Sequence, residues 1–287
     1  MKQFQFSNDV YKKQYHNQII VVKFGGALAK PESVKKIAEQ IGYLQTQVGA
    51  KVMVVHGGGG QINDALKAQG IEVKKDPATG LRVTDAQTLD VTDKMLKILN
   101  GDIVDIFNQV AGEKWRACGI SGYDRGVLEA VPVDGHGNYT GTMTGMKTGL
   151  MKEFLERGGV VPVLTSVCFN ALAGDGEENR LNVNADEVAV HVAVHMDAAR
   201  LIVCSDKDGV LNKQGKKISQ IFVDQVGGLI KDGTVTDGMI PKLKMLAQAV
   251  QEMKGGGGVA LVNGFEDKAI LKELLNKQGG GTLILER

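Results

Sequence analysis

Short runs of apolar, mostly β-branched residues recur along the chain and alternate with helical patterns. Residues 19–22 and 52–55 are continuously apolar, and similar runs lie at 160–164, 201–204, 259–262 and 282–285. Between the first two runs, apolar residues recur at the three- and four-residue spacing of a helix, at Val34, Ile37, Ile41, Leu44 and Val48. Continuously apolar strands that alternate with helices predict a mainly parallel sheet covered on both faces. The expected fold class is therefore α/β.

The remaining pattern predicts further helices and two loop-rich segments. Helices are expected at 85–99, 149–157, 186–196, 241–254 and 267–277. Pro241 is expected at the first helical position, which proline favours, and Gly255 follows the last turn of the same helix. Segment 131–148 predicts a hairpin or loop, and the acidic segment 172–180 predicts an exposed turn. We expect three parts, namely an N-terminal segment at 1–17, an N-lobe at 18–196 and a C-lobe at 197–287.

Composition narrows the possible partners and location. The formal net charge of +1 and the 5% content of aromatic residues argue against a nucleic-acid partner. No apolar run approaches the roughly 20 residues that a membrane-spanning helix needs, and the polar first residues lack the apolar segment of a signal peptide. Three scattered cysteines, Cys118, Cys168 and Cys204, fit a reducing compartment. We therefore expect a cytoplasmic protein with neither a nucleic-acid nor a membrane partner.

Two glycine-rich turns follow the first two apolar runs. Their sequences are KFGG at 23–26 and HGGGG at 56–60. Neighbouring parallel strands end at the same edge of a sheet, where open α/β sheets bind ligands. Glycine turns and helix N-termini offer backbone N–H groups to anions. The two turns predict sites for two anionic groups, although ordinary strand–helix turns are the alternative interpretation, and neither turn has the P-loop or dinucleotide-binding pattern.

Several polar residues stand where the local pattern does not favour them. Lys23 ends a predicted buried strand, which is costly unless its ammonium has a partner. Lys242 lies in the first turn of a predicted helix, where the helix dipole disfavours a cation. Asn182, Asn184 and Asp186 alternate along an extended segment and are expected to share one side, with Asp186 also predicted to be the N-cap of the following helix. Solvent-exposed lysines and a purely structural cap are the alternative.

Arg82 is a further candidate, because arginine can bind a carboxylate through two parallel hydrogen bonds. It precedes Thr84 and Asp85, of which one is expected to cap the next helix. The alternative is that Arg82 is an ordinary surface residue.

Two other features resemble metal sites but do not predict one. His191 and His195 have the four-residue spacing of paired zinc ligands on a helix, yet the surrounding residues are apolar, so packing is the expected role. Residues 206–209 (DKDG) are too short for a calcium-binding loop. Because they follow a predicted strand, a loop on the nucleotide side is the better prediction, and no metal-ligating residue is assigned.

Seven motifs in fixed order resemble the amino acid kinase family. They are VVKFGGAL (21–28), VVHGGGGQIN (54–63), GLRVTDAQTLDV (80–91), LNVNADEVA (181–189), LIVCSDKDGVL (201–211), TDGMIPKL (236–243) and ILKELLNKQGGGTLI (270–284). Within the family, the chain most resembles the members that phosphorylate N-acetyl-L-glutamate. The resemblance implies a three-layer αβα sandwich around a mainly parallel open sheet. It also implies that the N-lobe binds the acyl amino acid and dimerises, while the C-lobe binds ATP.

The resemblance also implies an activity and roles for individual residues. The implied activity is the ATP-dependent phosphorylation of a side-chain carboxylate to an acyl phosphate in arginine biosynthesis, with Mg²⁺ accompanying ATP. Lys23 and Lys242 would stabilise the transferring phosphoryl group, and Asp186 would hold both lysines. Substrate binding is implied for Gly58, Gly59, Arg82, Asn182 and Asn184, and nucleotide binding for Gly25, Gly26, Ser205, Asp206, Lys207, Gly209 and Lys242. A homodimer or hexamer is the implied assembly.

Departures from the family pattern leave alternatives open. Tyr123 stands where the family often has a lysine, and residues 139–145 (YTGTMTG) replace a different glycine-containing stretch. A sibling kinase acting on another carboxylate, such as carrier-protein-bound aminoadipate or glutamate, is therefore the second interpretation. A non-catalytic nucleotide or amino-acid sensor is the third. Lys268 replaces a histidine common before the last helix, which leaves control by arginine open.

Overall fold

An eight-stranded sheet runs through the centre of the computed structural model, which describes residues 9–77, 79–135, 138–236 and 238–287. The strand order is β10-β12-β11-β9-β1-β2-β6-β3. All neighbouring pairs are parallel except β11 with β12. The strands are β1 (Ile19–Phe24), β2 (Lys51–His56), β3 (Arg116–Ile120), β6 (Val160–Leu164), β9 (Arg200–Ser205), β10 (Gln220–Phe222), β11 (Gly258–Asn263) and β12 (Thr282–Leu285). The predicted mainly parallel sheet is confirmed.

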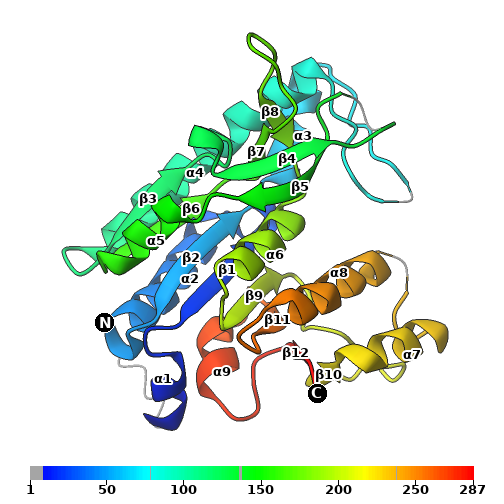
Figure 1. Ribbon diagram of the computed structural model, residues 1–287. Coiled ribbons are helices and arrows are strands. Elements are labelled where there is room, and N and C mark those ends of the chain that lie inside the picture. Colours follow the sequence, from blue (N-terminus) through cyan, green and yellow to red (C-terminus); the bar gives the residue numbers. More distant parts are fainter. Residues whose placement is uncertain (1–8, 78, 136–137, 237) are drawn as a thin grey trace.

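Alternating side chains of the sheet enter two separate cores. In β1, Ile20 and Val22 pack into one core, whereas Val21 packs into the other, because successive side chains of a strand point to opposite faces. One face is covered by α2 (Pro31–Tyr43), α4 (Ala86–Ala111) and α9 (Ala269–Leu275). The other face is covered by α5 (Gly149–Glu156), α6 (Ala185–His195) and α8 (Met239–Glu252), as Figure 1 shows. The predicted three-layer αβα arrangement is confirmed.

A second, four-stranded sheet lies beyond the main one and was not predicted. Its order is β5-β4-β7-β8, with β4 (Leu128–Pro132), β5 (Gly141–Met146), β7 (Val167–Asn170) and β8 (Arg180–Asn182). The antiparallel β4–β5 pair confirms a hairpin in segment 131–148, whose residues 136 and 137 lie outside the described part. Figure 1 shows this small sheet next to α3 and α4.

α5 and α6 lie within one residue of their predicted bounds, whereas three other helices differ more. α4 was predicted to end at Leu99 but continues to Ala111, because the apolar stripe resumes after Gly101 with Ile103 and Phe107. α8 begins at Met239, so Pro241 is its third residue rather than its first; the missing proline N–H still falls among the unbonded first four of the helix. α9 is shorter than predicted.

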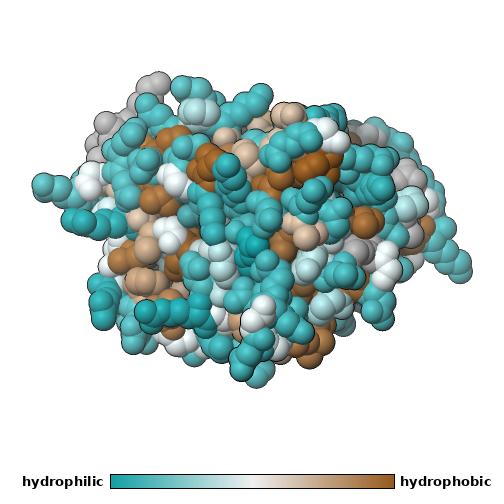
Figure 2. Space-filling view, turned by 90° about the horizontal axis from the view of Figure 1, so that it is seen from above, coloured by the Kyte–Doolittle hydropathy of each residue, from teal (hydrophilic) through white to brown (hydrophobic). Residues whose placement is uncertain are grey.

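Smaller elements complete the chain. They are α1 (Asp9–Tyr15), α3 (Gly59–Ala68), α7 (Val226–Lys231), a wide turn at Leu44–Val48, and short 3₁₀ turns at Gly26–Leu28, Asp124–Gly126 and Val223–Gln225. Every helix in the described part of the chain is too short or too polar to cross a bilayer. On the face seen from above in Figure 2, apolar residues form small groups separated by hydrophilic ones.

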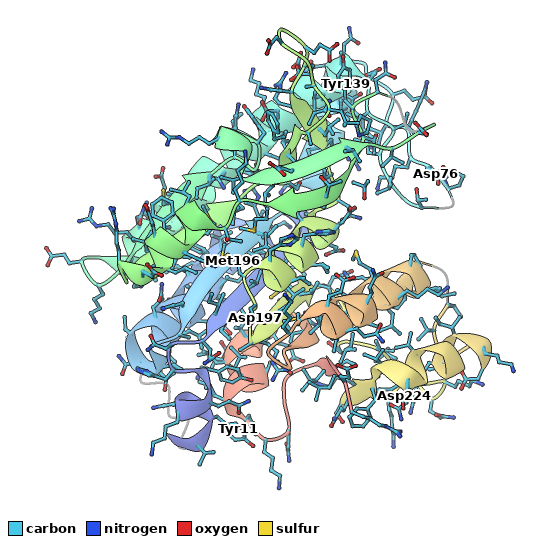
Figure 3. The ribbon with its side chains drawn as sticks, viewed as in Figure 1. Tyr11, Asp76, Tyr139, Met196, Asp197 and Asp224 are labelled. Carbon is cyan, nitrogen blue, oxygen red and sulfur yellow. The ribbon has the colours of Figure 1, made fainter. Side chains whose placement is uncertain are left out.

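The expected lobe boundary falls between α6 and β9. Figure 3 labels Met196 and Asp197 at this point, with Tyr139 above it and Asp224 below it. The main sheet runs across the boundary without a break, because β9 pairs with β1 on one side and β11 on the other. The division into lobes stays a prediction.

Candidate active site

The two glycine turns meet at one edge of the main sheet. β1 and β2 pair so that Phe24 lies opposite His56, and the Gly57 N–H donates to the Phe24 carbonyl at 3.0 Å. The Gln61 side chain donates to the Gly26 carbonyl at 2.9 Å and joins the turns directly. A Cβ added at Gly26 would lie 3.1 Å from the Gly58 carbonyl carbon, so this close approach requires glycine. The prediction of two turns at one edge is confirmed.

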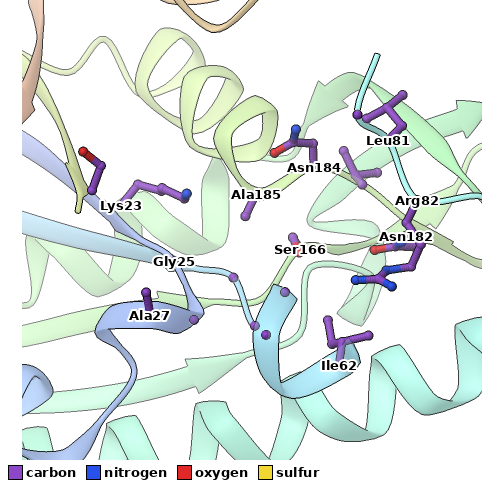
Figure 4. Close-up of a pocket in the computed structure, with 18 of the residues that line it drawn as sticks. Lys23, Gly25, Ala27, Ile62, Leu81, Arg82, Ser166, Asn182, Asn184 and Ala185 are labelled. Carbon is purple, nitrogen blue, oxygen red and sulfur yellow. The ribbon is translucent and has the colours of Figure 1, made fainter. Parts of the chain in front are cut away.

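A cavity of about 390 Å³ opens at this edge, within the size range of small-molecule sites. Figure 4 shows Lys23 at one end and Arg82 with Asn182 at the other, with Gly25, Ala185 and Ser166 between them. The sequence-predicted residues that line the cavity are Lys23, Gly25, Gly26, Gly58, Gly59, Arg82, Asn182, Asn184, Ser205, Asp206 and Lys242. Three predicted residues, Asp186, Lys207 and Gly209, are outside the lining set.

Lys23, Lys242 and Asp186 come together at one end of the cavity. Lys23 Nζ lies 2.6 Å from Asp186 Oδ1, and Lys242 Nζ lies 3.2 Å from Asp186 Oδ2. The three residues come from β1, α8 and α6. Burial raises the pKa of the Asp186 carboxyl, but the charges and hydrogen bonds of the two lysines outweigh burial and hold the pKa below its ordinary value. The Asp186 carboxyl is therefore ionised at neutral pH and contacts both lysine side chains.

The start of α6 places Asp186 for this contact. Asn184, not Asp186, caps the helix: its side-chain oxygen accepts a hydrogen bond from the Asp186 N–H at 2.9 Å, and its backbone is extended. The predicted Asp186 cap was wrong because the helix begins one residue earlier, at Ala185. The Asp186 carboxylate is consequently left to bind the two lysines.

Arg82 marks the opposite end of the cavity. Its Nη2 donates to the Asn63 side chain at 2.7 Å, whereas its buried Nη1 has no hydrogen-bond partner among the described residues. Burial lowers the pKa of the guanidinium, which nevertheless remains cationic at neutral pH. A buried donor without a partner is costly, so the geometry favours an anionic ligand at Nη1.

The backbone that carries Arg82 is fixed by two hydroxyl groups. Thr140 Oγ1 donates to the Arg82 carbonyl at 2.7 Å, and Thr84 Oγ1 donates to the same carbonyl at 3.0 Å. The Asn182 amide donates in turn to Thr84 Oγ1 at 3.0 Å. Asp85 caps α4 by accepting from the Thr88 N–H at 2.8 Å, as one of the two predicted caps.

Sequence reasoning assigned no role to Asn63, and it named Thr140 only as part of the departing stretch 139–145. Asn63 could have been found, because it lies four residues after Gly59 and so one helical turn beyond the glycine turn. The role of Thr140 could not be predicted from its neighbours, since its contacts with Thr84 and Arg82 join segments more than 50 residues apart.

The predicted nucleotide loop is only partly at the cavity. Ser205 and Asp206 line it, and the Ser205 side chain bonds to the backbone of exposed Lys207. Gly209 has φ +117°, and an added Cβ would collide with Thr282 Oγ1. Close packing therefore accounts for this glycine, and the nucleotide-binding roles of Lys207 and Gly209 stay predictions.

His56 supports the second glycine turn from inside the core. It is fully buried, and burial lowers its pKa to about 4 despite a hydrogen bond with the Gly57 carbonyl that raises it. The Asn100 amide lies 3.0 Å from His56 Nε2 and also donates to the Val163 carbonyl at 2.9 Å. The neutral imidazole, held by Asn100, thus fixes the position of His56, from which the second glycine turn starts.

His191 and His195 stack on α6, with ring centroids 5.8 Å apart. His195 Nδ1 also lies 2.8 Å from the His191 carbonyl oxygen. The described residues include no group of three His, Cys, Asp or Glu side chains that could hold a metal ion.

Comparison with known proteins gives a consistent result. The model of the amino acid kinase family matches residues 18–262. The chain is 36% identical to acetylglutamate kinase from Hydrogenobaculum sp. (strain Y04AAS1), over 95% of this chain and 93% of that protein. It is also 36% identical to acetylglutamate kinase from Nitrosospira multiformis, over 96% of this chain and 92% of that protein.

A solved structure shares the fold. N-acetylglutamate synthase from Neisseria gonorrhoeae, complexed with coenzyme A and N-acetyl-glutamate, superposes with a TM-score of 0.80 at 22% identity. The match covers 96% of this chain but only 61% of the synthase. At this identity the likeness concerns the fold alone.

Proposed function

Because the chain belongs to the amino acid kinase family, we propose that it transfers the γ-phosphoryl group of ATP to the side-chain carboxylate of N-acetyl-L-glutamate. The product is an acyl phosphate, formed in arginine biosynthesis. The names of its relatives at 36% identity support this activity. The observation that carries the proposal is a cavity with two lysines on one aspartate at one end and a partly unpaired arginine at the other.

The chemistry requires two anions to approach each other. An oxygen of the substrate carboxylate attacks the γ-phosphorus, the bond to the β–γ bridging oxygen breaks, and ADP leaves. The carboxylate is already ionised at neutral pH, so the reaction needs no strong general base. Catalysis then consists of positioning the reactants and neutralising their charge.

The cavity residues divide this work between its two ends. Lys23 and Lys242 neutralise the oxygens of the transferring phosphoryl group, and Asp186 holds both ammonium groups in place. The N–H groups of the turns at 25–26 and 58–59 bind phosphate and substrate oxygens. Arg82, oriented by Asn63, binds the α-carboxylate of the acyl amino acid, while Asn182 and Asn184 line its path.

Mg²⁺ fits this site as the partner of ATP rather than as a resident of a protein cage. Mg²⁺ in such sites is held largely by nucleotide phosphates, water and one or two carboxylates. Asp206 is the one carboxylate among the described residues that line the cavity, and it would help to hold the metal. Its carboxylate lies 3.7 Å from the Nζ of exposed Lys207. When bound, the metal supplies further neutralisation of the phosphate charge.

Turnover with trapping of the product tests the proposed activity. ADP release is measured with MgATP and N-acetyl-L-glutamate, glutamate, aspartate, aminoadipate or a carrier-linked acid, and hydroxylamine traps any acyl phosphate. We expect N-acetyl-L-glutamate to give the most hydroxamate. Hydroxamate from carrier-linked aminoadipate or glutamate instead would identify the sibling kinase, and ATP binding without any hydroxamate would identify a sensor.

Substitutions separate the roles of the two ends. We expect Lys242→Met or Lys23→Met to lower kcat by about 10²–10³-fold, as for the loss of a group that stabilises transition-state charge. Arg82→Ala should raise KM for the acid about 10- to 100-fold and leave KM for ATP unchanged, since one charged contact is lost. Lys244→Met, at an exposed lysine on the same helix as Lys242, is the control. Near-normal turnover in Lys242→Met would refute the assigned role.

The replaced family lysine at position 123 does not change the cavity wall. Tyr123 is not among the lining residues, and its hydroxyl lies 2.6 Å from Lys97 Nζ. Within the other departing stretch, residues 139–145, Thr140 does line the cavity, so the substrate panel decides between N-acetyl-L-glutamate and the sibling substrates. The homodimer or hexamer and the cytoplasmic location stay predictions, and light scattering in solution would test the assembly.

A further inference from the structure

Glu187 follows Asp186 in the first turn of α6 and contacts a different part of the molecule. Its Oε1 accepts a hydrogen bond from Thr142 Oγ1 at 2.6 Å and another from the Met143 N–H at 2.8 Å. Successive helix residues point about 100° apart around the axis. One turn of helix therefore binds the two lysines through Asp186 and strand β5 through Glu187.

The strand that Glu187 contacts is an edge strand. β5 lies at the end of the four-stranded sheet and pairs with β4 along its length, while Thr140, the residue before it, forms an isolated parallel bridge with Asn182 of β8. The outward N–H groups of an edge strand need partners outside the ladder, and Glu187 provides one for Met143. The ladder also shifts register between Glu129 and Ala130, opposite this part of β5. The side chain of Glu187 thus anchors β5 where its own pairing is irregular.

The same strand reaches the carboxylate-binding end of the cavity. Thr140 immediately precedes β5, donates to the Arg82 carbonyl at 2.7 Å and lies 3.1 Å from the Thr84 N–H, which donates to it. Hydrogen bonds and one short strand segment therefore connect α6 to the backbone of Arg82. The connection runs from Glu187 through Thr142 and Thr140.

We propose that Glu187 is a specificity-determining positioning residue, which sets the distance between the lysine end and the Arg82 end of the cavity. The proposal rests on the proposed function, in which the substrate spans both ends with its two carboxylates. Glu187 is not among the residues that line the cavity, so the proposed role is one of positioning and not of catalysis. By holding β5, Glu187 fixes the distance between the two ends of the cavity. This distance fits acyl amino acids whose two carboxylates are separated by the length of a glutamate side chain.

Three substitutions isolate the contact. Glu187→Gln keeps an Oε1 acceptor for both donors and removes the charge. Glu187→Ala removes both hydrogen bonds, and Thr142→Val removes one with little change of shape. kcat and KM are measured with N-acetyl-L-glutamate and with N-acetyl-L-aspartate, which is one methylene shorter, and KM is also measured for ATP.

We expect Glu187→Ala to raise KM for N-acetyl-L-glutamate about tenfold, since two hydrogen bonds to a charged acceptor are lost. In this variant, the ratio of kcat/KM for N-acetyl-L-glutamate to kcat/KM for N-acetyl-L-aspartate should fall about fivefold. The reason is that a less firmly held Arg82 end of the cavity discriminates poorly between acids of different chain length. Thr142→Val should show a smaller change in the same direction. Glu187→Gln should stay within about twofold of the wild type, and KM for ATP should not change.

An unchanged preference in Glu187→Ala, or equal rises in both KM values, would overturn the proposal. So would a Gln variant as impaired as the Ala variant, because the charge rather than the hydrogen bonds would then matter. If Glu187→Ala does not fold, Thr142→Val decides, and wild-type kinetics in that variant would count against us.

Hydrogen exchange tests the contact without turnover. We expect the Met143 amide to exchange faster in Glu187→Ala than in Glu187→Gln, and equal rates would overturn the anchoring of β5. Absence of turnover in the wild type would reject the proposed function. The hydrogen-exchange rates would still show whether Glu187 anchors β5.

Discussion

The cationic residues at the cavity each contact another side chain of the protein and still have hydrogen-bond donors available for a ligand. Each lysine ammonium has three donors, and Asp186 takes one contact from Lys23 and one from Lys242. Arg82 likewise binds Asn63 through Nη2 and has no described partner at Nη1. Such groups are already held in position before a reactant arrives, so little of their freedom has to be lost on binding.

Local sequence context revealed some of these residues and not others. Lys23 stood out because a lysine seldom ends a buried strand, and Lys242 because it opposes a helix dipole. Glu187 gave no signal, since an acidic residue in the first turn of a helix is what the dipole favours. Its partner Thr142 is 45 residues away, a contact that the three-dimensional arrangement creates and no local pattern predicts.

The buried His56 predicts how stability depends on pH. Its pKa is about 4 in the folded chain against 6.5 for the free side chain, so between these values the unfolded state binds more protons. Stability must then fall as the pH falls from 6.5 towards 4. For His56 alone, we expect the free energy of unfolding to drop by about 2 kcal/mol between pH 7 and pH 5.

Urea unfolding at both pH values measures this drop in the wild type and in His56→Gln. The variant should lose about 2 kcal/mol less than the wild type over the same interval. His191, whose pKa is also lowered mainly by burial, contributes to both proteins and cancels in the comparison. Equal losses would mean that His56 is not a buried neutral base.

Among the secondary structure elements, length and continuity of pattern decided which were predictable. Six strands of the main sheet, β1, β2, β6, β9, β11 and β12, coincide with the predicted apolar runs. β3, with the sequence RACGI, has no such run and was not predicted. β8 and β10 have three residues each, too few to show a period of two. Asn100 and Gly101 concealed the continuation of α4, because both residues are common where helices end, although Asn100 here is buried and bonded to Val163.

Gly101 lies in the interior of α4 and predicts a stabilising substitution. A Cβ at Gly101 meets no atom within 4 Å, and its φ is not positive. Gly101→Ala should therefore raise the free energy of unfolding by about 0.5–1 kcal/mol, because glycine loses more backbone freedom on folding. Urea unfolding measures the change.

Gly119→Ala is the matched contrast for this substitution. A Cβ at Gly119 would collide with the Asn100 side-chain oxygen, which holds its place through contacts with His56 and Val163. The free energy of unfolding should fall in this variant. A rise in both variants, or in neither, would show that space around the Cβ does not decide the outcome.

For the molecule as a whole, the shared sheet predicts a single cooperative unfolding transition. β9 lies between β1 and β11, so separating the two expected lobes would expose strand edges of both. Trp115, the one tryptophan of the sequence, is buried against Phe107 and reports on residues 18–196. Far-ultraviolet circular dichroism reports on helices of both parts.

Urea unfolding followed by both signals tests this expectation. The midpoints should coincide, as they do for a two-state transition. A circular dichroism change that precedes the fluorescence change would show that residues 197–287 open separately, which would support independent lobes.

The paired acids at the start of α6 also affect how the chain tolerates mutation far from the cavity. The helix is anchored at one turn to β1, α8 and β5, while its buried residues Val188 and Val192 pack in the core behind that turn. A change of volume at either valine that slides the helix along its axis would displace the ammonium groups and the hairpin together. The lysine end and the Arg82 end of the cavity would then be displaced by the same shift of α6. A compensating substitution in that helix would restore the position of both ends.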